Sequence, residues 1–200
     1  MKSEIRSRKS EILKEAMKLF LKRGYIKTGM RDISKASRIT AGTLYYYYKS
    51  KEDILADFLD GQISRNRETL EKMPCLFEQS DPSEALQKAL QVLFATGDEY
   101  IDVVLFLYQE NKNLSSKMWK KLTDSEDMLI QIFETIIQNG CDKGVFRVPN
   151  ARLAAHNIII MSDMWALRRW YLGNTFTSEQ YTKMQIEFIF HALRDGSFAK

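Results

Sequence analysis

Apolar residues recur at helical spacing along almost the whole chain. Near the N-terminus they form an i, i+3, i+4 stripe that predicts a helix over about residues 3–23. The same spacing, together with capping residues and helix-ending glycines, predicts further helices at about 30–37, 41–47, 51–74, 82–94, 99–111, 119–143, 151–172 and 178–194. The sequence contains no alternating strand pattern, repeat or low-complexity tract. It therefore predicts an all-α protein.

Two short predicted helices near the N-terminus are separated by a tight turn that contains Arg38. Thr40 offers an N-cap hydroxyl to the second of them, residues 41–47, which begins with small residues such as Gly42. Small residues at this position allow the helix backbone to approach a partner closely. A short exposed helix with hydroxyl-bearing side chains and basic neighbours is suited to reading the major groove of DNA.

Charge is distributed unevenly along the chain. Residues 1–51 contain 14 Lys and Arg but 4 Asp and Glu, whereas the whole chain of 200 residues has a formal net charge of +4. The remainder is therefore acidic overall. This pattern indicates that a polyanion binds the N-terminal segment. The simpler alternative is a basic helix face that is only solvated.

Residues 12–59 resemble the N-terminal DNA-binding domain of the TetR family of bacterial transcription regulators. Four motifs occur in the order that the family shows: Arg23-Gly24-Tyr25, Arg31-Asp32-Ile33-Ser34, Gly42-Thr43-Leu44-Tyr45 and Ser50-Lys51-Glu52-Asp53-Ile54-Leu55. In that family the third motif belongs to the recognition helix. A threonine at the position of Thr28 caps the helix that precedes the recognition helix, here about residues 30–37. Three positions depart from the family pattern: Ser37 replaces alanine, Arg38 replaces the glycine of the turn, and Tyr48 replaces phenylalanine.

The resemblance implies a helix-turn-helix domain over residues 1–50 and an effector-binding and dimerisation domain over 74–200, linked by a helix at 51–73. It implies a homodimer through the last two helices, of which 151–172 is apolar on most sides. Such a dimer would bind a palindromic operator in double-stranded DNA, because two recognition helices about 34 Å apart reach successive major grooves. The implied function is a transcription regulator, a repressor released from its operator by a small hydrophobic effector.

The residues that we predict to contact DNA lie on or beside the recognition helix. Ala41 and Thr43 should face base edges, and the basic residues should contact phosphates. Tyr47 should instead lie in the core with Leu44. The full predicted set is Lys27, Thr28, Arg31, Arg38, Thr40, Ala41, Gly42, Thr43, Tyr45, Tyr46, Lys49 and Lys51.

The resemblance also implies an effector pocket in the C-terminal domain, where aromatic and methionine side chains would form adaptable walls. The predicted lining set is Phe94, Tyr100, Val104, Tyr108, Trp119, Phe133, Met161, Met164, Trp165 and Arg168. The simpler alternative is that such residues are ordinary core. The run from Arg168 to Tyr171 suits an anionic head group, such as that of a fatty acid or its thioester, and so favours a lipid-like effector.

Other classes of protein find less support. The chain lacks a glycine-rich phosphate loop, G-x-S-x-G and H-E-x-x-H, so we expect neither an enzyme nor a bound cofactor or metal. Cys75 and Cys141 are far apart, which indicates a reducing cytoplasm. A thiol redox-sensing regulator that uses one of them, or a helical protein-interaction adaptor, remains an alternative.

The chain shows neither a secretory signal nor a membrane anchor. No apolar run approaches the ~18 residues of a membrane span, and the charged N-terminus has no apolar signal region. We therefore expect a cytoplasmic protein with no membrane partner.

Overall fold

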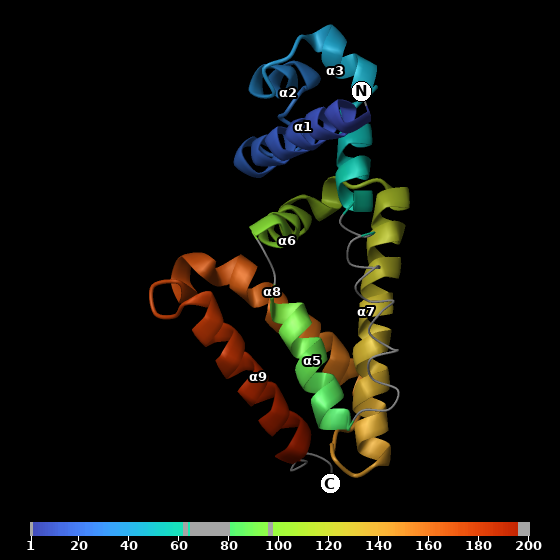
Figure 1. The fold of residues 1–200 in the computed structure, drawn as a ribbon, viewed down its shortest axis with the longest axis vertical. Coiled ribbons are helices and arrows are strands. Elements are labelled where there is room, and N and C mark those ends of the chain that lie inside the picture. Colours follow the sequence, from blue (N-terminus) through green and yellow to red (C-terminus); the bar gives the residue numbers. More distant parts are fainter. Residues whose placement is uncertain (1, 62–63, 65–80, 96–97, 196–200) are drawn as a thin grey trace. The chain divides into compact units, whose positions relative to one another are not determined.

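A computed structural model of the chain describes residues 2–61, 64, 81–95 and 98–195 (Figure 1). All regular structure in these ranges is helical, which confirms the predicted all-α class. The elements are α1 (Lys2–Arg23), α2 (Met30–Ala36), α3 (Ala41–Tyr47), α5 (Pro82–Phe94), α6 (Asp98–Glu110), the 3-10 turn η1 (Asn111–Asn113), α7 (Ser116–Asp142), α8 (Ala151–Leu172) and α9 (Ser178–Asp195). Residues 51–61 are also helical, without a label in Figure 1. The later part of the predicted 51–74 helix and Cys75 lie outside the described residues.

Helix starts follow the capping residues that the sequence offers. The side chains of Thr40, Asp81, Asn150 and Thr177 each accept a hydrogen bond from a backbone N–H two or three residues further on. Such caps satisfy amide groups that have no partner within the helix. One predicted start was wrong. The helix expected from Trp119 begins at Ser116, because the Ser115 hydroxyl accepts from the N–H of Met118 at 3.4 Å.

The cap of α2 corrects a second prediction. Gly29, not Thr28, is its N-cap residue, and the Gly29 N–H donates to the Asp32 carboxylate at 3.0 Å. The Thr28 hydroxyl turns the other way and donates to the carbonyl oxygen of Gly24 at 2.9 Å. The Thr28 hydroxyl therefore stabilises the end of α1 rather than the start of α2.

Contacts divide the chain into two compact units. The N-terminal unit comprises Met1–Arg65 and Leu105–Lys121, and the C-terminal unit comprises Asn66–Val104 and Leu122–Lys200. The segment Leu105–Lys121, which the sequence analysis assigned to the second domain, thus belongs by its contacts with the first.

The core of the N-terminal unit is formed where α1, α2, α3 and the helix at 51–61 meet. Phe20, Ile33, Leu44 and Ile54 are fully buried there. Phe106 of α6 joins this core, with its ring centroid 6.1 Å from that of Phe20. Because Phe106 is also fully buried, residues far along the sequence help to close this unit.

The C-terminal unit packs α5, α8 and α9 against one another, together with the part of α7 that follows Lys121 (Figure 1). Phe133 and Ile137 of α7 are buried in its core beside Phe146 of the connector to α8. The N–H of Arg147 in that connector donates to the Leu193 carbonyl of α9 at 2.7 Å. Among the described residues, no helix is both long enough and apolar enough to cross a bilayer.

The ring of Phe146 packs so closely against Gly140 of α7 that no side chain fits at position 140. A Cβ atom at position 140 would lie 2.0 Å from Cδ2 of Phe146. Gly140→Ala should therefore lower the free energy of unfolding by ~1–3 kcal/mol through overpacking, measured by thermal or urea unfolding.

Two further variants define the cause of that loss. Asn139→Ala, on the same turn of helix, adds no side-chain atom and should have little effect. Adding Phe146→Leu to Gly140→Ala should recover part of the loss, because the smaller side chain makes room. A double variant no better than the additive sum would contradict this account.

Candidate nucleic-acid interface

Helix α3 presents its first turn to solvent. The Thr40 Oγ1 accepts from the Thr43 N–H at 3.1 Å, and the Thr40 and Thr43 hydroxyls are 2.8 Å apart. Ala41, Gly42 and Thr43 are all exposed. Leu44, on the opposite face, is fully buried and holds the helix to the core.

The tyrosines that follow divide between surface and core. Tyr45 is 54% exposed and Tyr46 79% exposed, which fits their predicted place on the DNA side. Tyr46 packs edge-to-face against Tyr47, with ring centroids 5.3 Å apart. The prediction that Tyr47 is the core tyrosine was wrong, because Tyr47 is only half-buried whereas Tyr48 is 4% exposed.

Tyr48 links the C-terminal end of α3 to the helix at 51–61. Its hydroxyl donates to the Asp57 carboxylate at 2.6 Å, and the Lys9 ammonium lies 3.4 Å from the same oxygen. Burial, with the hydrogen bond to Asp57, raises the pKa of Tyr48 well above its ordinary value. The phenol thus stays protonated and links α1, α3 and the helix at 51–61.

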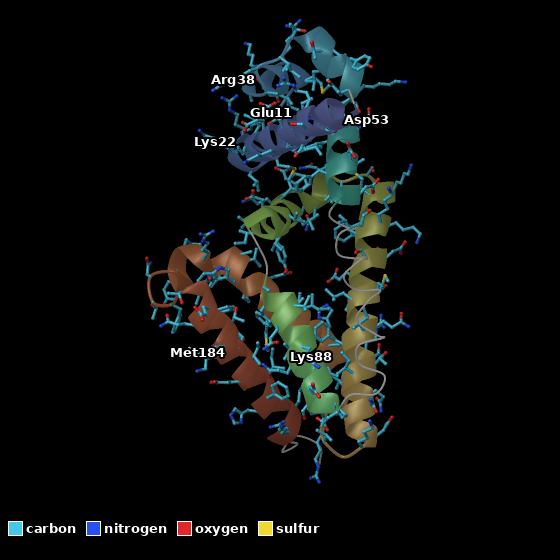
Figure 2. The ribbon with its side chains drawn as sticks, viewed as in Figure 1. Glu11, Lys22, Arg38, Asp53, Lys88 and Met184 are labelled. Atoms are coloured by element: carbon cyan, nitrogen blue, oxygen red, sulfur yellow. The ribbon has the colours of Figure 1, made fainter. Side chains whose placement is uncertain are left out.

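The turn before α3 contains a strained backbone position. The N–H of Ile39 donates to the Ser34 carbonyl and that of Arg38 to the Lys35 carbonyl, at 3.0 and 3.2 Å. This pair of bonds is a Schellman motif, which requires a left-handed residue at its centre. Arg38 takes that conformation with φ 54°, alone among the described non-glycine residues. Figure 2 labels Arg38 at the junction of α2 and α3.

Most of the predicted phosphate contacts are available on the surface. Lys27, Arg31, Arg38 and Lys49 are exposed. They lie close in sequence to α3, in the N-terminal segment where Lys and Arg outnumber Asp and Glu by 14 to 4.

Two predicted DNA contacts have other roles. Thr28 is 1% exposed and its hydroxyl is bound within the fold, so its side chain does not reach a phosphate. The Lys51 ammonium donates to the carbonyl oxygens of Tyr25, Ile26 and Thr28 at 2.7, 3.3 and 3.2 Å. These three bonds occupy all three ammonium donors. Lys51 therefore holds the α1–α2 loop, a role that the sequence analysis missed.

The predicted effector residues are divided between the two units. Tyr108 and Trp119 belong to the N-terminal unit and are exposed, whereas the others belong to the C-terminal unit. There, Phe94, Val104 and Phe133 are buried, Met161, Met164 and Trp165 are half-buried, and Arg168 is exposed. The side chain of Tyr100 lies outside the described residues.

Two of the half-buried residues, Met161 and Trp165, pack directly against α9. The Trp165 ring lies 5.2 Å from that of Tyr181, whose hydroxyl donates to the Met161 carbonyl at 3.0 Å. This packing fits the alternative in which they are ordinary core residues.

The structure also contains a groove that the sequence analysis did not predict. It has a volume of about 780 Å³ and lies between α5 and α9. Its lining includes Gln87, Gln91, Thr182, Ile186 and His191, and none of the predicted effector residues. Cys141 is a half-buried free thiol. The described residues hold no cluster of three side chains suited to a metal ion.

Family models match both parts of the chain. The model for bacterial regulatory proteins of the tetR family matches residues 12–58, and the model for the tetracyclin repressor-like C-terminal domain matches residues 79–193. The protein belongs to the TetR family. It is thus a DNA-binding transcription regulator with a helix-turn-helix domain and a C-terminal helical domain, and its family is one of regulators rather than of enzymes.

Curated relatives extend over nearly the whole of this TetR-family chain. The HTH-type transcriptional repressor KstR2 of Mycobacterium tuberculosis is 25% identical over 192 residues, which cover 93% of this chain and 92% of KstR2. The HTH-type transcriptional regulator HbdR of Aromatoleum sp. (strain CIB) is 25% identical over 186 residues, which cover 90% of this chain and 77% of HbdR.

Solved structures show the same fold. PfmR, a TetR-family regulator from Thermus thermophilus, superposes with a TM-score of 0.68 at 25% identity, covering 92% of this chain and 94% of PfmR. AibR, solved with isovaleryl coenzyme A and operator DNA, superposes with a TM-score of 0.73 at 20% identity, covering 92% of this chain and 98% of AibR. At that identity the similarity to AibR shows the fold alone.

The contrast between Lys51 and Lys49 yields a matched pair of variants. Lys51→Met should lower the free energy of unfolding by ~1–3 kcal/mol, because it leaves carbonyl groups without their donor. Lys49→Met should leave stability unchanged and make the negative slope of log K for DNA against log salt shallower by ~0.9, the value for one phosphate contact. Thermal unfolding and salt titrations measure both. A Lys51 variant of full stability with a reduced slope would instead make Lys51 a phosphate contact.

Arg38 combines backbone strain with an exposed charge, and substitutions separate the two. Arg38→Asn keeps a residue that tolerates the left-handed region, so stability should be maintained or slightly raised. Loss of the charge should weaken DNA binding and reduce the salt slope by ~0.9. Arg38→Lys, which retains the charge, is the control and should retain the slope. Unchanged DNA binding by Arg38→Asn would show that this side chain does not contact the operator.

Proposed function

We propose that this TetR-family protein represses transcription by binding a palindromic operator through α3 of two protomers, and that a small hydrophobic effector releases it. The observation that carries the proposal is α3 itself. Its first turn and two of its tyrosines are exposed on a basic unit, while Leu44 fixes the opposite face. A helix presented in this way fits the major groove. A regulator that binds chromosomal DNA acts in the cytoplasm.

The proposed dimer uses α8 and α9. Leu153 on α8 and Met184 and Phe188 on α9 are large apolar side chains exposed in the single chain (Met184 is labelled in Figure 2). Burying such side chains against a second copy would remove their apolar surface from water. Two-fold symmetry would also match a palindromic operator, since one seven-residue helix spans only a few base pairs.

The proposed effector combines an apolar part with an anionic group. AibR, a structural neighbour, was solved with isovaleryl coenzyme A, a thioester of this kind. In this chain the Arg168 guanidinium lies 5.3 Å from the ring centre of exposed Trp170 and 5.8 Å from that of Tyr171. The exposed guanidinium of Arg168 can donate two parallel hydrogen bonds to a carboxylate or phosphate group. Release then requires the effector to bind the DNA-free form more tightly than the operator-bound form.

A binding assay tests the proposal. The full chain is titrated onto the DNA immediately upstream of its own coding region at two salt concentrations, with excess unrelated competitor DNA. Selective binding that weakens with salt is the expected result. Isovaleryl coenzyme A, free coenzyme A and a fatty acid are then added in turn to find which chemistry releases the DNA. Equal binding to every fragment at both salt concentrations would contradict the proposed repressor.

Tyr45 provides a test of how the surface of α3 is used. We predict that its exposed hydroxyl contacts the DNA backbone, so Tyr45→Ala should weaken binding to operator and competitor DNA by a similar factor. Tyr45→Phe, which removes only the hydroxyl, should reproduce most of that loss. A change confined to the preferred bases would show that Tyr45 reads sequence instead.

A further inference from the structure

We infer that α3 selects its operator chiefly by apolar contact with thymine methyl groups, through the side chains of Ala41 and Thr43. The inference rests on the proposed function, since it describes how the proposed operator is read. It concerns the class of base feature recognised, which is a methyl group rather than a hydrogen-bonding edge.

The first step is the chemistry that α3 lacks. Residues 41–48 contain no Arg, Lys, Asn, Gln, Asp or Glu. Those side chains make the bidentate or charged contacts by which a recognition helix distinguishes guanine, adenine and cytosine in the major groove. Tyrosine and threonine hydroxyls are the side-chain hydrogen-bonding groups that α3 itself can present.

The second step is the orientation of Thr43. Its hydroxyl lies 2.8 Å from the Thr40 hydroxyl, and its backbone N–H donates to the same Thr40 oxygen at 3.1 Å. A β-branched side chain has few χ1 positions, so the contact between the two hydroxyls restricts the rotamer of Thr43. With the hydroxyl turned toward Thr40, we expect the γ-methyl of this exposed residue to face the groove.

The third step is the surface beside Thr43. Ala41 is exposed and offers a methyl group alone, and Gly42 between them adds no side chain. A Cβ at Gly42 would meet only Thr40 Oγ1, at 3.9 Å, so the helix surface is open there. Residues two apart do not share a helix face, so the two methyl groups are presented at separate points of the first turn of α3. Thymine is the base that carries a methyl group in the major groove.

The fourth step is the division of roles around α3. Lys27, Arg31, Arg38 and Lys49 are exposed and can supply affinity through phosphates, which carry no sequence information. Selectivity is then left to the surface of α3. The methyl contacts distinguish A·T from G·C pairs and fix which strand carries the thymine.

The experiment begins with an operator selected by the full chain from a random library of double-stranded DNA. The enriched half-sites should contain invariant A·T pairs. Each thymine is then replaced by uracil, which removes the methyl group and leaves base pairing intact. Affinity should fall about fourfold for each contacted methyl, the value expected for one buried methylene-sized group. Uracil outside the half-sites serves as the control and should have no effect.

Two variants that separate the hydroxyl from the methyl group assign one methyl contact to Thr43. Thr43→Ser keeps the hydroxyl and its bond to Thr40 but lacks the methyl, so it should bind the thymine operator about fourfold more weakly. It should also become insensitive to uracil at one position. Thr43→Val keeps a methyl group without the hydroxyl and should remain sensitive there. Thermal unfolding confirms that both variants fold.

The outcomes separate this inference from the proposed function. Selective binding with no loss at any uracil position overturns methyl recognition and leaves the repressor proposal standing, with tyrosine hydroxyls or DNA shape as the source of selectivity. Failure to enrich any sequence, with equal binding to all duplexes at both salt concentrations, overturns both.

Discussion

An isolated helix of seven residues is not stable in water, and the recognition helix of this protein has that length. Its conformation must come from the unit that carries it. Leu44 supplies a fully buried anchor on one face, Thr40 caps the start, and Tyr48 ties the end to Asp57. Because these anchors occupy the inner face and both ends, the outer face is left to contact DNA.

The N-terminal unit that carries α3 also depends on residues beyond the helix-turn-helix segment. Phe106 completes the aromatic cluster with Phe20 and Tyr25, and the carboxylate of Glu110 accepts from the Tyr25 N–H at 3.0 Å. Lys51 binds the carbonyl groups of the loop that contains Tyr25. The N-terminal unit is therefore stabilised by residues that a boundary drawn near residue 50 would exclude. Affinity and selectivity for DNA rest on this support, since it fixes where α3 and the basic side chains lie.

The C-terminal unit shows how composition alone can mislead about a binding site. Aromatic and methionine residues suited to an adaptable pocket are spread over two units, and several of them, such as Phe133, are close-packed core. The groove between α5 and α9 is lined by polar side chains with Ile186 and Phe190 among them. A residue type indicates what a side chain can do, whereas a site also requires that several such side chains converge.

The sequence by itself determined the helical class, the family and the local signals. The caps at Thr40, Asp81, Asn150 and Thr177 were predictable because each cap and its partner lie within three residues of one another. The sequence also placed Tyr45 and Tyr46 on the DNA side of the helix, and both are exposed. Local geometry repeats where the same residues occur, so the pattern predicted these caps, although it placed the cap of α2 at Thr28 instead of Gly29.

Only the tertiary structure decided the roles of residues whose partners are distant in sequence. Lys51 lies 26 residues from Tyr25, and Tyr25 lies 85 residues from Glu110, so no local pattern connects them. Thr28 and Tyr47 were misassigned for a related reason, because burial depends on which elements pack over a side chain. Hydrophobic and capping patterns are set by neighbours along the chain, whereas burial and hydrogen-bond partners are set by neighbours in space.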